Sequence, residues 1–214
     1  MNRTGKPYLH IPQPSARPGD KPDFSYLDLS EAGEINRPPT DASAASIEFL
    51  AHELVRVLDD DHVAQGPWDP TLDEETLIKA LRHIVLTRTY DDRMQRMQRQ
   101  GKISFYMQSL GEEAISIGQG LALEDDDMLF TAYRNQGLYI LRGTSLVDMM
   151  CQCLSNTRDM CKGRQMPIFY QNKKGNLFTI SGNLATQFPQ AVGWAMGAGI
   201  KGEPNIAASW VGDG

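Results

Sequence analysis

Residues Ile206 to Gly214 read IAASWVGDG, and this stretch decides the fold. Its apolar part, Ile206 to Val211, predicts a β-strand, and the Gly-Asp-Gly that follows places a carboxylate at the carboxyl edge of a predicted parallel sheet. Open α/β sheets bind their ligands at that edge. Glycines let a bulky polyanion approach the backbone, and Asp213 can hold a hard cation such as Mg²⁺ that neutralises phosphate. A strand, a tight turn and an acid imply further chain, so we expect these 214 residues to be the front part of a longer enzyme.

The composition indicates a globular protein and argues against a nucleic-acid partner. The chain has 214 residues, 41% of them hydrophobic, which is enough for one large domain or for one domain with an arm. Its formal net charge is −6 with both signs spread along the sequence, whereas binding to nucleic-acid phosphates calls for a basic stripe. Two acidic runs, residues 59–61 and 124–127, are interpreted as solvated turns and not as metal sites.

Nothing in the sequence predicts a membrane partner or a secretory route. No stretch approaches the roughly 20 apolar residues of a transmembrane helix. Residues 1–7 have no apolar signal core, and the region after them does not resemble a transit peptide, so we expect a cytoplasmic protein. The three cysteines, which have no histidines at zinc-finger spacing, are expected to be buried reduced thiols: Cys151, Cys153 and Cys161.

Residues 1–45 are predicted to form an extended arm, and residues 46–214 the domain. Seven of the twelve prolines lie in the arm, at positions 7, 12, 14, 18, 22, 38 and 39, and no helical or strand periodicity persists there. The arm contains an apolar patch of Phe24, Tyr26, Leu27 and Leu29. This patch predicts that the arm lies on a surface, its own or a partner's.

Two helices are predicted after the arm. The first spans residues 42–58, where apolar residues recur at helical spacing, and it is broken by the glycine and prolines of residues 66–70. The second spans residues 73–100 and is the strongest, with Thr71 and Glu74 as its predicted capping box. Its predicted core-facing stripe consists of Leu77, Ile78, Leu81, Ile84, Val85, Met94 and Met97.

Polar residues follow the predicted strands. Residues 128–131 are predicted to form a strand that delivers Tyr133 and Arg134 to the same edge as Asp213. Arginine at such an edge suits a phosphate or a carboxylate. Residues 111–113, a glycine and two glutamates, fit the amino end of a helix that faces a polar site.

Three later segments have more than one interpretation. Residues 155–178 are irregular, as binding loops often are. Residues 181–187 are rich in hydroxyl and amide oxygens, which suits a monovalent cation or a polar ring, or else a simple helix cap from Thr186 or Asn183. Residues 197–202 match the dinucleotide fingerprint G-x-G-x-x-G. They end a predicted helix instead of opening one, so a nicotinamide-binding interpretation is disfavoured.

Short motifs follow one another along the chain in a characteristic order. They are Ser104-Phe105-Tyr106-Met107, Gly111-Glu112-Glu113-Ala114, Tyr133-Arg134, Lys162-Gly163-Arg164-Gln165-Met166-Pro167, Ser181 to Gln187 and Gly212-Asp213-Gly214. In this order the chain resembles the alpha subunits of thiamine-diphosphate-dependent 2-oxo acid dehydrogenases, most of all the branched-chain (2-oxoisovalerate) type. The resemblance runs from the arm to the last residue. It implies an incomplete thiamine-diphosphate-binding α/β fold, with a parallel sheet flanked by helices and an extended N-terminal arm.

The resemblance assigns residues to a cofactor and a substrate. Tyr133 and Arg134 would contact the diphosphate, and Gly182 and Leu184 would meet the aminopyrimidine ring through their backbones. Phe105 would form a wall for an aliphatic substrate tail. These assignments are implied by the family motifs and by their positions in this sequence.

The resemblance also assigns metal ligands. Asp213 matches the acid of the family's Mg²⁺ motif. Asp213 and its neighbour Gly214 would both contact the cofactor. The loop that resembles the family's K⁺ site contains Ser181, Asn183, Thr186 and Gln187. The paired asparagines that complete the Mg²⁺ motif and an active-site histidine would lie beyond these residues, and the activating glutamate belongs to the beta subunit. No catalytic residue is therefore assigned here, and the 214 residues alone are expected to be inactive and to bind thiamine diphosphate poorly.

The activity implied is oxidative decarboxylation of 2-oxo acids, with acyl transfer to a lipoyl group, the disulfide acceptor, on a partner acyltransferase. The implied assembly contains two alpha and two beta subunits within a multienzyme complex. Two alternatives stay open: a pyruvate- or acetoin-type dehydrogenase alpha subunit, and a catalytically incompetent fragment that serves only as a subunit-interaction module.

Overall fold

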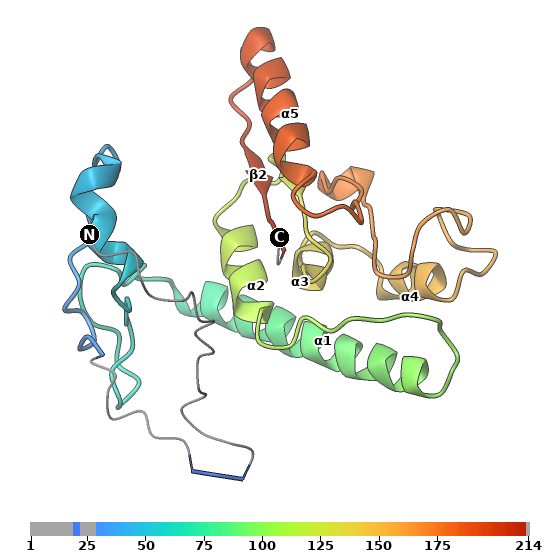
Figure 1. Cartoon of the computed structure of the whole chain (residues 1–214), viewed down its shortest axis with the longest axis horizontal. Coiled ribbons are helices and arrows are strands. Elements are labelled where there is room, and N and C mark those ends of the chain that lie inside the picture. Colours follow the sequence, from blue (N-terminus) through green and yellow to red (C-terminus); the bar gives the residue numbers. More distant parts are fainter. Residues whose placement is uncertain (1–18, 22–28, 213–214) are drawn as a thin grey trace, which may run out of the picture. The chain divides into compact units, whose positions relative to one another are not determined.

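The computed structural model describes residues 19–21 and 29–212 (Figure 1). The chain divides between Thr71 and Leu72 into two compact parts, each of which holds together through its own contacts. The arm residues Phe24, Tyr26 and Leu27 lie outside the described residues. The predicted arm and its boundary after residue 45 stay a prediction.

The first part contains the 3₁₀ helix η1 (Ala44–Ala51). Ser43 caps it, and its hydroxyl oxygen accepts a hydrogen bond from the Ser46 amide at 3.3 Å. The helix predicted over residues 42–58 was wrong beyond Ala51. The physical reason is that no residue of η1 is buried, so no packed apolar face stabilises a longer helix.

The acidic run at residues 59–61 forms a turn, as predicted. The Asp59 carboxylate accepts hydrogen bonds from the amides of Asp61 and Val63, at 3.0 and 2.8 Å, and from the Gln65 side chain at 3.0 Å. An aspartate that binds the backbone two and four residues ahead closes a turn in this way. The run therefore has a local structural role.

The second part begins with α1 (Glu74–Arg99), which confirms the helix predicted over residues 73–100. Its cap is Asp73, whose carboxylate accepts a hydrogen bond from the Thr76 amide at 2.7 Å. The capping box predicted at Thr71 was wrong. Thr71 lies in the left-handed region at φ 48°, and an aspartate directly before the first helical residue is a strong cap.

Only the second half of α1 belongs to the core. Its buried apolar residues are Tyr90, Met94 and Met97. The first turns carry Leu77, Ile78, Leu81 and Val85, each of them more than half exposed. The predicted stripe is therefore confirmed for Met94 and Met97 and wrong for these four positions, which nothing covers in the part of the chain that the structure describes.

The sheet consists of β1 (Met128–Phe130) and β2 (Ala207–Ser209), which pair in parallel. The register runs from Met128 opposite Ala207 to Phe130 opposite Ser209. Both strands lie within the segments that their apolar patterns predict, and the parallel pairing is as predicted. Their carboxyl ends therefore meet at one edge.

A buried acid aligns the amino ends of the two strands. Asp127, directly before β1, accepts hydrogen bonds from the amides of Ile206 at 2.7 Å and Glu124 at 2.9 Å. The acidic run at residues 124–127 is thus a turn, as predicted, although Asp127 itself is buried and not solvated. Throughout residues 19–21 and 29–212, no three histidine, cysteine, aspartate or glutamate side chains gather in a possible metal site.

The remaining helices are α2 (Glu113–Leu121), α3 (Gln136–Leu141), α4 (Leu146–Cys153), η2 (Lys173–Gly175) and α5 (Gln187–Lys201). Helix α1 packs against α2 and α3, and α5 packs against both strands (Figure 1). This arrangement confirms the α/β class with a parallel sheet flanked by helices. None of the described helices is both long and apolar enough to span a membrane.

The core contains the three cysteines, all buried and free, which confirms the prediction of reduced thiols. Cys153 lies with its sulfur 3.2 Å from the Tyr170 hydroxyl, and Tyr170 packs edge-on against Tyr139 with the ring centroids 5.5 Å apart. Burial raises the pKa of the Cys153 thiol. A thiol in this environment stays protonated and behaves as a packing residue.

The glycine-rich run at residues 197–202 ends α5. Gly202 adopts φ 73°, and its amide donates to the carbonyls of Ala198 and Gly199, which is a typical left-handed helix cap. A dinucleotide fingerprint would instead open a helix after a strand. The structure therefore argues against a nicotinamide site at this run.

Candidate functional site

The candidate site lies at the carboxyl edge of the sheet, where the chain leaves β1 and β2. A pocket of about 190 Å³ at this edge is lined by Glu112, Tyr133 and Arg134, among others, and by Trp210 and Gly212 from the segment after β2. The edge thus brings together the predicted pair Tyr133 and Arg134 and the first glycine of Gly-Asp-Gly. Asp213 and Gly214, the predicted Mg²⁺ ligand and its neighbour, lie outside the described residues.

The turn that carries Tyr133 and Arg134 is fixed by Asn135. Its side-chain oxygen accepts a hydrogen bond from the Ala132 amide at 2.8 Å, and its side-chain nitrogen donates to the Ser116 hydroxyl at 3.2 Å. Asn135 is buried, so both bonds are shielded from water. The turn is therefore rigid before any ligand binds.

Arg134 is held over the neighbouring ring. Its guanidinium lies 5.0 Å from the centre of the Tyr133 ring, and one of its nitrogens lies 3.7 Å from the Glu112 carboxylate. The separation from Glu112 is too long for a close ion pair. Both the Arg134 guanidinium and the Glu112 carboxylate therefore line the pocket.

A second pocket, of about 140 Å³, adjoins the first through Tyr133. Its lining is apolar and consists of Phe105, Met107, Tyr133, Met166, Ile168, Phe169 and Gly182. The structure thus brings the predicted residues Phe105, Tyr133 and Gly182 around one space. A Cβ atom at Gly182 would lie 3.1 Å from the Phe169 ring, so the glycine keeps the backbone close to this ring. Leu184 is 47% exposed and is not part of this lining.

The segment 181–187 forms a tight turn before α5. The Ser181 hydroxyl accepts the Asn183 amide at 3.2 Å, and the Thr186 hydroxyl donates to the Asn183 carbonyl at 2.9 Å. Thr186 occupies the N-cap position, but its side chain makes no capping hydrogen bond. The simple helix-cap interpretation of Thr186 is therefore wrong.

Gln187 has an oxygen without a partner. Its side chain is buried, and its nitrogen donates to the Thr131 carbonyl at 3.2 Å. The side-chain oxygen is buried and lacks a hydrogen-bond partner within the described part of the chain. A buried amide oxygen left without a donor costs free energy. This oxygen is a candidate ligand for a bound cation, since hard cations take oxygen ligands.

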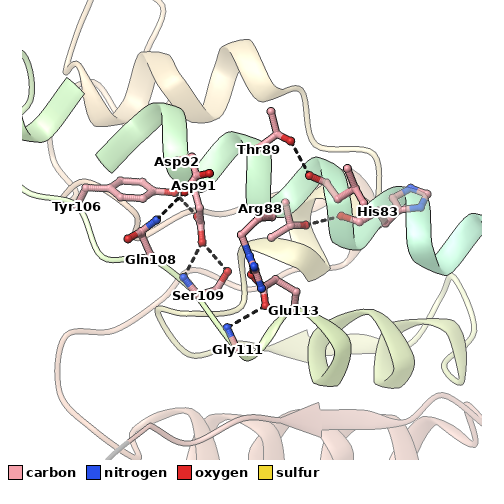
Figure 2. A network of polar contacts seen from close by, with 12 residues as sticks. His83, Arg88, Thr89, Asp91, Asp92, Tyr106, Gln108, Ser109, Gly111 and Glu113 are labelled. Carbon is pink, nitrogen blue, oxygen red and sulfur yellow. Dashed lines mark hydrogen bonds and ion pairs between the residues drawn. The ribbon is translucent and has the colours of Figure 1, made fainter. Parts of the chain in front are cut away.

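Asp91 forms a buried polar network that the sequence did not predict (Figure 2). Its carboxylate accepts the Tyr106 hydroxyl at 2.6 Å and both the amide and the hydroxyl of Ser109, at 2.7 and 2.8 Å. Burial raises the pKa of the Asp91 carboxyl, while the three hydrogen bonds act in the opposite direction. The one local signal is that Asp91 lies on the same helix face as the buried Thr87 and Met94.

A second contact joins α1 to the start of α2 (Figure 2). Arg88 donates from Nε to the Glu113 carboxylate, and the other oxygen of Glu113 accepts the Gly111 amide at 2.9 Å. The hydrogen bond from Arg88 lowers the pKa of the Glu113 carboxyl. Of the two glutamates predicted to face a polar site, Glu112 lines the pocket, whereas Glu113 is a buried structural residue.

Comparison with known proteins places these residues in a family. The family model described as "Dehydrogenase E1 component" matches residues 81–214, and that described as "2-oxoisovalerate dehydrogenase E1 alpha subunit N terminal" matches residues 6–45. The 2-oxoisovalerate dehydrogenase subunit alpha of Pseudomonas aeruginosa is 57% identical over 96% of this chain and 50% of its own length. The mitochondrial human protein of that name is 34% identical over 96% of this chain and 49% of its own length. The chain therefore spans about half the length of these relatives.

Proposed function

Because this chain belongs to the dehydrogenase E1 component family, we propose that it acts as part of the alpha subunit of the decarboxylating component of a branched-chain 2-oxo acid dehydrogenase complex. One observation carries the proposal. Tyr133 lines two pockets: one that contains the charged side chains of Glu112 and Arg134, called the polar pocket below, and an apolar one that contains Phe105 and Gly182. A charged cofactor tail and an apolar substrate tail call for two such neighbouring spaces.

The polar pocket suits the diphosphate of thiamine diphosphate. Arg134 supplies a positive charge and several N–H donors in a planar fork, and the Tyr133 hydroxyl lies at the same wall. Gly212 lies against the Tyr133 ring and has no side chain that would displace this ring from the pocket wall. Mg²⁺, held in part by Asp213, would neutralise charge that a single arginine leaves uncompensated.

The turn at residues 181–187 supports the assignment of the other end of the cofactor. Gly182 lines the apolar pocket with its backbone, and Leu184 follows it with a side chain that is half exposed. The unpartnered oxygen of Gln187 favours a K⁺ ion bound at this turn, together with Ser181, Asn183 and Thr186. Such an ion would stiffen the backbone that meets the aminopyrimidine ring.

When bound, thiamine diphosphate supplies the carbanion chemistry that allows a 2-oxo acid to lose CO₂. The residues of this chain bind and orient. Arg134 fixes the anionic end, and the packed ring of Phe105 excludes water from the substrate tail. No proton transfer is assigned to a residue of this chain.

The substrate is proposed to be a branched-chain 2-oxo acid. The apolar pocket of about 140 Å³ is the size of a few methylene and methyl groups, and Phe105 and Met107 are part of its lining. The alternative is an alpha subunit that acts on pyruvate or acetoin. Turnover of 2-oxoisovalerate and pyruvate by the assembled enzyme distinguishes the two: the proposal expects the branched acid to be preferred, and a preference for pyruvate would contradict it.

The partners proposed are a beta subunit, in an assembly of two alpha and two beta chains, and a lipoyl-bearing acyltransferase that accepts the acyl group on its disulfide. The exposed apolar turns of α1, with Leu77, Ile78 and Leu81, favour association with another chain. A cytoplasmic location also stays a proposal. If the chain co-purified with a beta subunit but the assembly never turned over a 2-oxo acid, the interaction-module alternative would be favoured instead.

A further inference from the structure

The segment between α1 and α2 brings side chains to the substrate pocket without any regular secondary structure of its own. Residues 101–112 contain turns, bends and irregular backbone but no helix or strand. Phe105 and Met107 line the apolar pocket, while Tyr106 between them is buried against α1. Extended backbone alternates side chains in this way. The position of the pocket wall therefore depends on what holds Tyr106.

Asp91 holds both Tyr106 and Ser109, which lie before and after Met107 in the segment. The Tyr106 hydroxyl donates to one oxygen of Asp91 at 2.6 Å, and Ser109 donates twice to the other, from its amide at 2.7 Å and from its hydroxyl at 2.8 Å. Figure 2 shows the carboxylate of Asp91 pointing from α1 into this segment. Met107 thus lies between two points that one carboxylate fixes.

A further hydrogen bond joins the segment to α3, the helix that follows the turn with Tyr133 and Arg134. Gln136, the first residue of α3, donates from its side chain to the Met107 carbonyl at 2.7 Å. It follows directly after the turn that carries Tyr133 and Arg134. The wall formed by Phe105 and Met107 is therefore held from two elements, by the Asp91 carboxylate of α1 and by the Gln136 side chain of α3.

We propose that Asp91 is the positioning residue that sets the selectivity of the pocket for the size of the 2-oxo acid tail. It lines neither of the two pockets and acts through Tyr106 and Ser109, which fix Phe105 and Met107. A pocket discriminates between tails only if its wall does not move to fit them. The inference rests on the proposed function and adds a residue that determines specificity.

The test compares Asp91→Asn with Asp92→Asn in the full alpha subunit assembled with its beta subunit. Asparagine has the same shape, but an NH₂ group replaces one of the two carboxylate oxygens. Tyr106 and Ser109 donate to different oxygens of Asp91, so one of the two contacts loses its acceptor. Asp92 is the next residue of α1 and is exposed, with one long contact of 3.3 Å to Gln108 in the same segment. It is therefore a matched control for charge, helix and segment.

The measured quantity is the ratio of kcat/KM for 2-oxoisovalerate to kcat/KM for pyruvate. Hydrophobic pockets discriminate roughly 10- to 200-fold per methylene group, so we expect the ratio to fall roughly tenfold in Asp91→Asn, mainly through a raised KM for the branched acid. It should stay within about twofold in Asp92→Asn. Hydrogen exchange at the Ser109 amide should become faster in the first variant only.

A merely structural role for Asp91 would lower stability and slow both substrates alike, leaving the ratio unchanged, and that result overturns the inference. Ser109→Ala, which removes one hydrogen bond and keeps the amide, is the milder variant and decides the matter if Asp91→Asn does not fold: its ratio should fall in the same direction. If the wild-type assembly turns over neither acid, the proposed function fails and the inference fails with it. If the wild type is selective and both variants keep the wild-type ratio, only the inference fails.

Discussion

Gly212 lies directly against the ring of Tyr133. A Cβ atom built on Gly212 would lie 2.9 Å from the Tyr133 hydroxyl oxygen and 3.0 Å from Cε1. The two residues come from the carboxyl ends of the two parallel strands, 79 positions apart, and their contact brings Gly-Asp-Gly to the turn that carries Arg134. Both residues line the proposed diphosphate pocket.

Gly212→Ala should therefore weaken cofactor binding. The added methyl group must displace the Tyr133 ring, and overpacking of this kind costs about 1–3 kcal/mol. We expect the affinity of the assembled enzyme for thiamine diphosphate to fall roughly tenfold, which calorimetry can measure.

The matched control is Gly197→Ala, because a Cβ atom there has nothing within 4 Å. That residue lies inside α5, where alanine should stabilise the fold by about 0.5–1 kcal/mol and leave cofactor affinity unchanged. Equal affinities in the two variants would contradict the role given to Gly212.

The contact between Arg88 and Glu113 should make stability depend on pH. The pKa of Glu113 is lowered from its ordinary value of 4.5, so the unfolded chain binds the proton first as the pH falls. The stabilisation is complete above about pH 4.5 and is lost as the pH falls through the folded pKa. Glu113→Gln should cost about 1–2 kcal/mol at pH 7, because Arg88 remains partly hydrated, and the difference from wild type should shrink in acid.

Thermal unfolding at several pH values measures this difference. Glu112→Gln is the comparison, since the Glu112 carboxylate lies 3.7 Å from Arg134 and is partly exposed, and it should change Tm less at pH 7. A constant gap between wild type and Glu113→Gln from pH 7 to pH 3 would show that the carboxylate charge does not matter.

The unpartnered oxygen of Gln187 should make the fold respond to K⁺. We expect the wild-type Tm to be about 2–4 °C higher in K⁺ than in Na⁺ at equal ionic strength, and this difference to vanish in Gln187→Leu. Gln190 lies three positions further along α5 and is exposed. Gln190→Leu should keep the difference in Tm between K⁺ and Na⁺. If the wild type unfolds at the same temperature in both salts, the turn does not bind K⁺.

Local patterns predicted most of the elements that build the site. The apolar runs at residues 128–131 and 206–211 contain the two strands, and the residues just after them line the polar pocket. Parallel strands align their carboxyl ends, so the meeting of Arg134 and Gly212 follows from the pairing. The helix at residues 73–100 could also be predicted, because its helical spacing of apolar residues continues over a long stretch.

Contacts between elements could not be predicted in this way. The Asp91 carboxylate binds residues 15 and 18 positions ahead, on a segment with no periodicity of its own. Nothing in an isolated pattern tells whether Asp91 is hydrated or buried, since that depends on what packs against α1. The same reason explains the first turns of α1, where apolar spacing predicted burial of Leu81 and no described residue covers it.

The central claim is that Arg134 holds the anionic end of thiamine diphosphate. Titration of thiamine diphosphate with Mg²⁺ into the assembled enzyme tests it most directly, in the wild type, in Arg134→Met and in Arg158→Met, whose side chain is exposed and remote from the pocket lining. Loss of charged hydrogen bonds costs about 1.5–3 kcal/mol, so we predict an affinity roughly 10- to 100-fold weaker in Arg134→Met and unchanged in Arg158→Met. Wild-type affinity in Arg134→Met would contradict the account.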